Sequence, residues 1–234
     1  ALMLSSCDSG AVFDYRYRLT VEVETTEGLK TGSSVIQVRK WLGRAGGAPA
    51  SSQIYTRVRG EAVEVDLPGE QTLFALLRSD SNIHWAGTIV SALTPRLSDA
   101  DGKPRFDGVL QLKGEVELPR YLRRSRRGPG PSAYPMLVTI GDLGDPTSVE
   151  RVDPDDLAAT FGEGARLKRV TVQLTDDRVT TGIEKRLGWL PDYYDKQLSG
   201  DRFQMLKNKH KGLSAFISSG VFSAGVGVRE DGAD

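Results

Sequence analysis

The feature that most constrains the fold is the stretch 15–24, in which apolar and polar side chains alternate almost without a break. The apolar set recurs at every second position: Tyr15, Tyr17, Leu19, Val21 and Val23. Arginine, threonine and glutamate occupy the positions between them. Successive side chains of a strand point to opposite faces of a sheet, so this period predicts a strand that is buried on one face only. One-sided burial is typical of antiparallel sheets.

Further strand signals follow along the chain. Glu27-Gly28 begins a turn, and the stretch 33–41 has the pattern of an antiparallel partner for 15–24. The apolar stretch 83–93 fits either a strand or a helix. Other short segments have strand-like composition and lie between turn signals: 53–59, 62–67, 71–77, 109–118, 136–140 and 167–174.

Helix signals are fewer and lie later in the chain. An aspartate-rich start at 153–156, with a proline in the first turn and Gly162 at the end, predicts a short helix. Asp177 is placed to cap a second helix over 179–190, and 192–211 has the composition of a third. The sum is a mainly β (α+β) fold, an antiparallel β-sandwich or open barrel with two or three helices in the C-terminal half.

The same signals divide the chain into five segments. A loop rich in arginine, proline and glycine separates two β regions, and we expect these two regions to complete one domain. The segments are an N-terminal tether, 1–12; an antiparallel β region, 13–118; the loop, 119–135; a β region with helices, 136–211; and a Gly/Ser-rich strand or tail, 212–234.

Composition argues against several classes of protein. Thirty-one basic residues balance thirty-one acidic ones, so we expect no nucleic-acid partner, because phosphate binding needs a cationic surplus. One cysteine cannot form an internal disulfide, and one cysteine with two histidines does not suffice for a structural zinc site. The longest uncharged run, 212–228, is short of the roughly 20 apolar residues that cross a membrane as a helix. We also expect no cofactor, since the sequence contains no phosphate-cradling glycine loop.

The single cysteine lies in a short motif near the start of the sequence. Leu4-Ser5-Ser6-Cys7 resembles a bacterial lipobox, the Leu-small-small-Cys motif of bacterial lipoproteins. The resemblance implies cleavage before Cys7 and lipid on its thiol and its new amino group, and several acyl chains anchor a protein stably. Asp8 resembles the signal that keeps enterobacterial lipoproteins in the inner membrane. The implied location is the periplasmic face of that membrane; the alternative is a cytoplasmic protein with an ordinary N-terminal tail.

A second resemblance concerns the block 136–190, which begins MLVTIGDLGDPTSVERVDPDDL. It is similar to segments of uncharacterised bacterial proteins. The resemblance implies a bacterial origin and carries no activity with it.

Five arginines gather in the loop between the two β regions: Arg120, Arg123, Arg124, Arg126 and Arg127. Clustered guanidinium groups bind phosphates, anionic lipid headgroups and acidic partners. Beside a lipidated Cys7, this loop would make a second contact with the membrane or with a protein partner. The alternative is that its charge only keeps an exposed loop soluble.

No group of residues in the sequence has the pattern of a catalytic site. Ser79, Asp80 and His84 are the residue types of a nucleophilic triad, but neighbours in one short loop seldom converge in space. The aspartates at 99–107 and 153–156 fit turn and helix-start chemistry without a metal. We therefore assign no catalytic and no metal-binding residue.

The leading hypothesis is a non-catalytic, membrane-tethered envelope lipoprotein. It would serve as an accessory or assembly module of a membrane protein complex, with a protein partner in the inner membrane or envelope. Two alternatives stay open. One is a hydrolase whose site assembles from separated Asp, Ser and His residues, with His84 or His210 meeting a carboxylate in a deep pocket. The other is a soluble binding protein.

Overall fold

The computed structural model describes residues 12–44, 52–122, 124–125, 128–202 and 212–225. Its longest elements are the strands β1 (Phe13–Thr25) and β2 (Gly28–Arg44), which pair as an antiparallel hairpin. Gly28 follows the two-residue turn with a positive φ of 104°, a conformation that favours glycine. All five apolar side chains of the alternating stretch are buried, which confirms the predicted one-sided strand.

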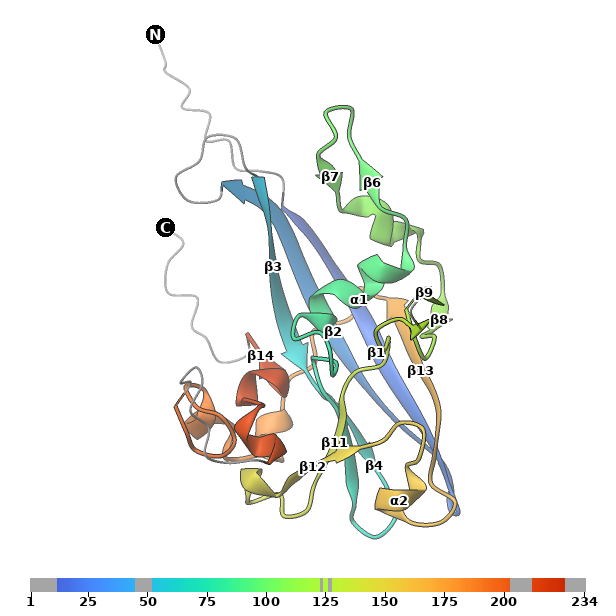
Figure 1. The fold of residues 1–234 in the computed structure, drawn as a ribbon, viewed down its shortest axis with the longest axis vertical. Coiled ribbons are helices and arrows are strands. Elements are labelled where there is room, and N and C mark those ends of the chain that lie inside the picture. Colours follow the sequence, from blue (N-terminus) through green and yellow to red (C-terminus); the bar gives the residue numbers. More distant parts are fainter. Residues whose placement is uncertain (1–11, 45–51, 123, 126–127, 203–211, 226–234) are drawn as a thin grey trace.

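Six strands form the large sheet, in the order β14-β3-β2-β1-β13-β8 (Figure 1). Every neighbouring pair in it is antiparallel. Because β13 pairs with β1, the two β regions of the sequence contribute to one sheet. The remaining strands of this sheet are β3 (Ser52–Glu61), β8 (Glu115–Glu117), β13 (Arg166–Leu174) and β14 (Ser223–Ala224).

A smaller antiparallel sheet lies across the lower half of the large one, in the order β12-β11-β5-β4 (Figure 1). The two sheets approach closely where Gly32 of β2 meets Glu64 of β4: a Cβ atom at Gly32 would lie 1.8 Å from the Glu64 carbonyl oxygen. The strands of this sheet are β4 (Val63–Asp66), β5 (Thr72–Ala75), β11 (Leu137–Ile140) and β12 (Val149–Val152).

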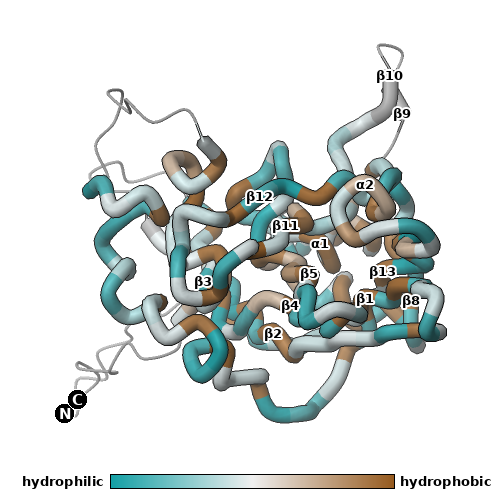
Figure 2. The backbone as a smooth tube through the Cα atoms, turned by 90° about the horizontal axis from the view of Figure 1, so that it is seen from below, coloured by the Kyte–Doolittle hydropathy of each residue, from teal (hydrophilic) through white to brown (hydrophobic). Residues whose placement is uncertain are grey.

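The small sheet is buried on both faces. Leu73 and Ala75 of β5 belong to the core between the two sheets, whereas Phe74 belongs to a second core on the other face. Trp189 and Phe222, from the segments after β13, pack into that second core. Figure 2 shows hydrophobic segments gathered between the β1–β2 layer and the β11–β12 layer. The architecture is a mainly β antiparallel sandwich, as the sequence predicted.

The helix α1 (Trp85–Leu93) packs on the inner face of the large sheet, above the small sheet (Figure 1). The Tyr17 hydroxyl donates a hydrogen bond of 2.8 Å to the Ala86 carbonyl, which joins α1 to β1. Trp85 Nε1 donates to the Ala133 carbonyl at 2.9 Å. The ambiguous stretch 83–93 is therefore mostly helical, and its apolar side chains help to fill the core.

The short helix predicted after 153–156 is α2 (Ala158–Phe161). Asp156 Oδ1 accepts a hydrogen bond from the Ala159 amide, so an aspartate does serve the first turn. Gly162 ends the helix with a φ of 92°. The helix lies in the predicted place and ends at the predicted glycine, but it begins only at Ala158, so Pro154 lies before its first turn.

The helix predicted over 179–190 is absent. The described chain has two short 3₁₀ turns there, η3 (Ile183–Lys185) and η4 (Leu190–Tyr193). Asp177 does not cap a helix, because its carboxylate accepts a hydrogen bond from the Thr175 hydroxyl and forms an ion pair with Arg18. The buried Glu61 carboxylate instead binds the start of η3, and this tertiary contact replaces the local capping that the sequence suggested.

The segment 109–118 was expected as one strand and is only partly one. Its first half lies in the 3₁₀ turn η1 (Asp107–Gln111), and Gly114, with a φ of 66°, separates this turn from the short strand β8. The other short elements are the hairpin of β6 (Leu97–Ser98) and β7 (Pro104–Arg105), the hairpin of β9 (Arg124–Ser125) and β10 (Gly128–Pro129), and the turns η2 (Pro146–Ser148), η5 (Leu213–Ala215) and η6 (Ser219–Val221). Among the described residues, no helix is long and apolar enough to span a membrane.

Candidate functional site

A cavity of about 610 Å³ lies between α1, the β6–β7 hairpin, η1 and strands β2 and β3. In Figure 1 this region is the upper half of the large sheet, where the small sheet no longer covers it. Its volume is within the range of small-molecule sites, about 300–1,000 Å³. Much of the wall is apolar and comes from Ile54, Leu97, Phe106, Val109 and Leu122. We refer to this space as the Lys40 cavity.

Lys40 brings a charge into this apolar setting. It follows Ile36 and Val38 on the inward face of β2, and only 7% of its surface is exposed. Its Nζ donates a hydrogen bond of 2.6 Å to Ser91 Oγ on α1. Within the described chain, no carboxylate lies within 4.0 Å of Nζ. Loss of hydration lowers the pKa of Lys40, because burial disfavours the charged ammonium.

Ser91 also lies beside a second buried polar group. Burial raises the pKa of Tyr15 to about 12, and the neighbouring Ser91 hydroxyl offsets part of that rise. Tyr15 pairs in register with Val38, two residues before Lys40. The hairpin and α1 therefore hold a phenol, a hydroxyl and an ammonium together under the helix.

Two arginines add positive charge to the wall of the Lys40 cavity. Arg105 forms an ion pair with Asp107 across the start of η1. Arg96 is exposed and has no ion pair in the part of the chain that the structure describes. With one acid against three cations, the cavity presents a net positive charge beside an apolar surface.

A neighbouring cavity of about 320 Å³ continues along α1. It shares Asn82, Thr88, Ala92 and Leu122 with the Lys40 cavity, so the two spaces adjoin. Both cavities therefore lie along α1.

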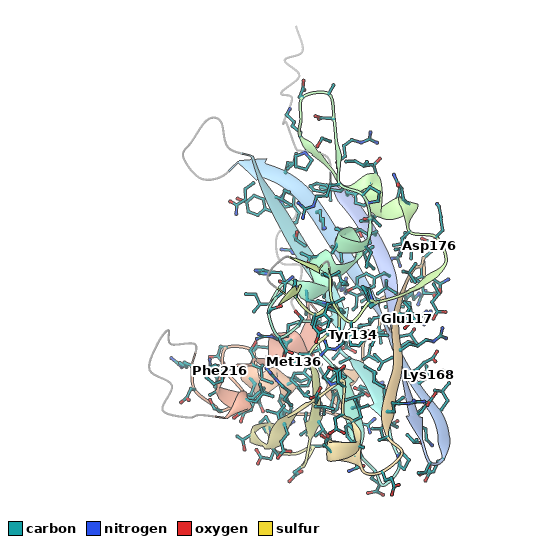
Figure 3. The ribbon with its side chains drawn as sticks, turned by 45° about the vertical axis from the view of Figure 1, so that its right-hand side comes forward. Glu117, Tyr134, Met136, Lys168, Asp176 and Phe216 are labelled. Carbon is teal, nitrogen blue, oxygen red and sulfur yellow. The ribbon has the colours of Figure 1, made fainter. Side chains whose placement is uncertain are left out.

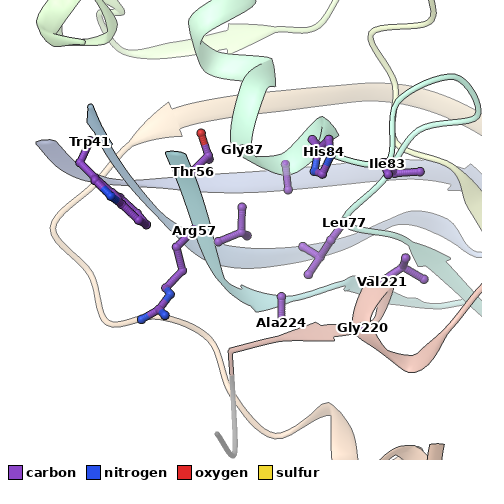
Figure 4. A pocket seen from close by; sticks show the side chains of 12 residues that line it. Trp41, Thr56, Arg57, Leu77, Ile83, His84, Gly87, Gly220, Val221 and Ala224 are labelled. Carbon is purple, nitrogen blue, oxygen red and sulfur yellow. The ribbon is translucent and has the colours of Figure 1, made fainter. Parts of the chain in front are cut away.

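A third cavity, of about 390 Å³, lies at the edge of β3 and shares Thr56 with the Lys40 cavity (Figure 4). It contains His84, which is exposed, and Arg57. No carboxylate lines it. The histidine-carboxylate pair that a hydrolase of the predicted kind requires is not formed at His84, and His210 lies outside the described residues.

The loop that holds Ser79, Asp80 and His84 does not assemble a triad. Ser79 Oγ accepts a hydrogen bond from the Asn82 amide, which stabilises the turn before α1. Asp80 forms an ion pair of 3.0 Å with Arg151 on β12. Ser79 and Asp80 thus serve local structure, and His84 is exposed.

The aspartates weighed as cation ligands also serve turns. Asp99 Oδ1 accepts from the amides of Asp101 and Lys103 in the β6–β7 hairpin. Asp153 Oδ1 accepts from the Asp155 amide before α2. Among the residues that the structure describes, no group of three potential ligands is arranged to hold a metal ion.

Arg120 is the part of the arginine loop that the structure describes in full. Its guanidinium donates to both Asp155 carboxylate oxygens, at 2.8 to 3.1 Å, and to Ser132 Oγ. It also lies over the rings of Tyr121 and Tyr134, the latter labelled in Figure 3. Arg120 therefore anchors the loop to the segment before α2. The side chain of Arg124 and all of Arg123, Arg126 and Arg127 lie outside the described residues, as do Cys7 and Asp8.

Sequence reasoning missed Lys40 and Ser91. A signal was present, because Lys40 follows Ser34, Ile36 and Val38 at the inward positions of its strand. A charge on the buried face of a predicted strand costs free energy unless a partner compensates it. Ser91 carried no comparable signal, since its contact with Lys40 depends on how α1 packs on the sheet.

Comparison with known proteins adds no relative: no family model, no curated protein and no solved structure matches this chain.

Proposed function

We propose that the protein binds an amphipathic anion, a molecule with a carboxylate or phosphate head and an aliphatic chain, in the Lys40 cavity. The observation that carries the proposal is the buried Lys40 ammonium, which lines this cavity without a carboxylate partner among the described residues. A buried charge is expensive unless something neutralises it. A bound anion would supply the missing negative charge.

The walls of the cavity favour an aliphatic chain on that anion. Leu97, Phe106 and Val109 offer apolar surface on one side, and Ile54 is 47% exposed on the other. Burying apolar area contributes about 25 cal/mol per Å². The adjoining cavity along α1 extends the apolar path beyond Lys40. The head would lie between Lys40 and Arg96, with the chain along the helix.

The test compares three ligands that share one chain: dodecanoate, dodecyl phosphate and the uncharged dodecanol. Binding is measured by calorimetry to the natural protein, to Lys40→Met and to Lys30→Met, a control near the start of the same strand, outside the Lys40 cavity. The natural protein and the control should bind either anion at least about tenfold more tightly than the alcohol, because a charged hydrogen bond contributes roughly 1.5–3 kcal/mol. Lys40→Met should lose this preference. Equal binding of acid and alcohol to the natural protein would contradict the proposal, and the stronger of the two anions identifies the head group.

The same pair of residues supports a second candidate, an acyl hydrolase with Ser91 as nucleophile and Lys40 as its base. The 2.6 Å contact and the lowered lysine pKa favour it, because a neutral amine can take the serine proton. Hydrolysis of p-nitrophenyl decanoate, lost in Ser91→Ala, together with labelling of Ser91 by a fluorophosphonate, would establish this candidate. If neither hydrolysis nor labelling is observed, the hydrolase is rejected and only the binding function remains.

We propose further that the binding site is carried on a lipid-anchored envelope protein that acts as an accessory module of a membrane complex. The lipobox-like motif ending at Cys7 supports this address. Expression of the full native gene in a bacterial host, followed by intact mass, tests it against Cys7→Ser. Cleavage before Cys7 with a lipid adduct, absent in the variant, is the expected result. An uncleaved and unmodified chain in both samples would reject the address and leave a soluble binding protein.

A further inference from the structure

The strand β3 lies near one edge of the large sheet and is covered there over only a short length (Figure 1). Its neighbour β14 pairs with Gly60 and Glu61 alone, and the Ala62 amide donates to the Phe222 carbonyl at 2.8 Å. The Val58 carbonyl oxygen faces the same side, because a Cβ atom on Gly225, just after β14, would lie 3.2 Å from it. Hydrogen-bonding positions alternate along a strand, so the main-chain groups of Thr56 and Ile54 point the same way as those of Val58. Among the described residues, Ile54, Thr56 and Val58 have register partners in β2 alone, and β14 does not reach them.

The side chains on the outer face of this edge are cationic. Arg57 and Arg59 are exposed, and neither forms an ion pair with any residue in the described ranges. Arg57 stands directly opposite Arg39 of β2, and Arg39 is itself opposite Asp14 of β1. Across the three strands, an acidic residue on β1 is thus followed by a basic residue on β2 and another on β3. Like charges directly opposite each other destabilise a sheet. A carboxylate at the next position outward would balance Arg57.

The inner face of the same edge opens into the cavity of about 390 Å³ (Figure 4). Thr56 and Val58 lie on this side, since they contact the position of Gly87 in α1. Leu77 and Val221 contribute apolar wall, and Ile83 is 64% exposed beside them. An apolar side chain on an added strand would enter this cavity.

We propose that β3 is a docking edge for an extended segment of a partner protein, in which acidic side chains alternate with apolar ones. The partner adds as a strand next to β3, beyond the end of β14. Its main chain bonds to Ile54, Thr56 and Val58, its acids face Arg57 and Arg59, and its apolar side chains enter the cavity at His84. This mode of recognition takes affinity from main-chain hydrogen bonds and specificity from alternate side chains. A second copy of β3 fits poorly, because it would bring arginine toward arginine.

The proposal does not depend on the Lys40 cavity, and a peptide tests it directly. The probe is a seven-residue peptide of alternating glutamate and valine, with glutamate at both ends, added to the full protein labelled with ¹⁵N. Three comparison peptides carry lysine for glutamate, N-methyl groups on the valines, or N-methyl groups on the glutamates. Expected results are binding of the glutamate peptide, slowed exchange of the Thr56 and Val58 amide protons, and loss of binding with only one of the two N-methylated peptides. In an added strand, the amides of every second residue face β3 and the remaining amides face solvent. N-methyl groups on the amides that face β3 remove the hydrogen bonds to it, whereas N-methyl groups on the other amides leave those hydrogen bonds intact.

A charge reversal supplies the matched control. Arg57→Glu with Arg59→Glu should weaken binding of the glutamate peptide by roughly tenfold or more and strengthen binding of the lysine peptide. Arg178→Glu with Lys185→Glu makes the same change in net charge at other exposed positions and should leave both affinities near those of the natural protein. Absence of binding overturns the proposal. Binding by both N-methylated peptides would also overturn it, because it would reveal a charge attraction without strand addition. A dimer of the protein formed through two β3 strands would overturn it as well.

Discussion

Lys40 of β2 and Ser91 of α1 are separated by 51 residues in the chain, yet Lys40 Nζ lies 2.6 Å from Ser91 Oγ. The bond joins the sheet and the helix that together bound the largest of the cavities described above. A neutral hydroxyl accepts one of the three ammonium hydrogens and leaves the positive charge unbalanced. Groups whose pKa is shifted in this way cluster at functional sites. The pair is therefore the centre of the functional interpretation.

Replacement of Lys40 by methionine should stabilise the protein in the absence of ligand, by about 1–2 kcal/mol near neutral pH. Methionine keeps the unbranched chain and removes the buried charge. The pKa of Lys40 is lower in the folded than in the unfolded state, so the cost of burying its charge is fully present below the folded value. The stability of the natural protein should rise as pH increases from there toward the ordinary lysine pKa.

Urea denaturation of both proteins at neutral and alkaline pH checks this prediction. The advantage of Lys40→Met over the natural protein should shrink as the pH rises. Lys30→Met, near the other end of β2, should show no such trend. A variant less stable than the natural protein at neutral pH would mean that Lys40 is well compensated within the fold.

Glu61 should be a structural carboxylate that joins the large sheet to η3. It is 2% exposed, and its two oxygens accept from the amides of Gly182 and Ile183 at 2.9 and 3.0 Å. Glu61→Ala leaves both amides without a partner and should cost roughly 3 kcal/mol of unfolding free energy. Glu61→Gln retains one carbonyl acceptor and should cost less.

The pH dependence of stability distinguishes Glu61→Gln from the natural protein. Burial raises the pKa of Glu61 in the folded state, an effect that outweighs the two amide hydrogen bonds. Its contribution to stability is then greatest below the unfolded pKa and decreases as pH rises through the folded value. Glu61→Gln, measured by thermal unfolding over the mildly acidic range, should have a flatter profile than the natural protein. Profiles that superimpose would contradict the burial of an ionisable group.

Gly32 should tolerate no side chain. A Cβ atom there would lie 1.8 Å from the Glu64 carbonyl oxygen, where the backbones of β2 and β4 meet. Overpacking in a rigid core costs about 1–3 kcal/mol and sometimes more, and here the obstacle is backbone. Gly32→Ala should therefore fold poorly or lose at least about 3 kcal/mol. Gly188→Ala is the control, since nothing lies within 4 Å of its added methyl, and its unfolding midpoint should stay close to that of the natural protein.

The ion pair between Arg120 and Asp155 should contribute little, no more than about 1 kcal/mol, because Asp155 is more than half exposed. Arg120 holds the pKa of Asp155 below its usual range, chiefly through their hydrogen bonds. The contribution is present at neutral pH and is lost as pH falls through the folded pKa of Asp155. Asp155→Ala should thus be slightly less stable than the natural protein at neutral pH and equal to it in strong acid. A constant difference at both pH values would contradict this assignment.

Local periodicity in the sequence predicted much of the fold. The alternation of apolar and polar residues over 15–24 predicted β1 and its buried face, and the order of aspartate, proline and glycine predicted a short helix where α2 lies. The failures have a common physical cause. Asp177 has the composition of a helix cap, but Arg18, distant in sequence, takes its carboxylate, and Glu61 orders the segment that follows. Tertiary contacts of this kind leave no local pattern.

The candidate site was harder to predict than the fold. Lys40 could be placed on an inward face from the alternation of β2, but the cavity beside it forms only where α1 and the β6–β7 hairpin pack against the sheet. The arginine loop attracted attention because of its charge, whereas Arg120 is already paired within the molecule. Charge density along a sequence does not distinguish free cations from paired ones.

The most direct test of the central claim is an NMR titration of the Lys40 side chain, with ¹³C-labelled lysine, over alkaline pH. Lys40→Met identifies the signal. The free protein should show a Lys40 pKa below that of ordinary lysine, and saturating dodecanoate or dodecyl phosphate should raise it, because a bound anion stabilises the ammonium. Dodecanol should produce no such increase. A Lys40 pKa that neither anion changes would contradict the proposed site.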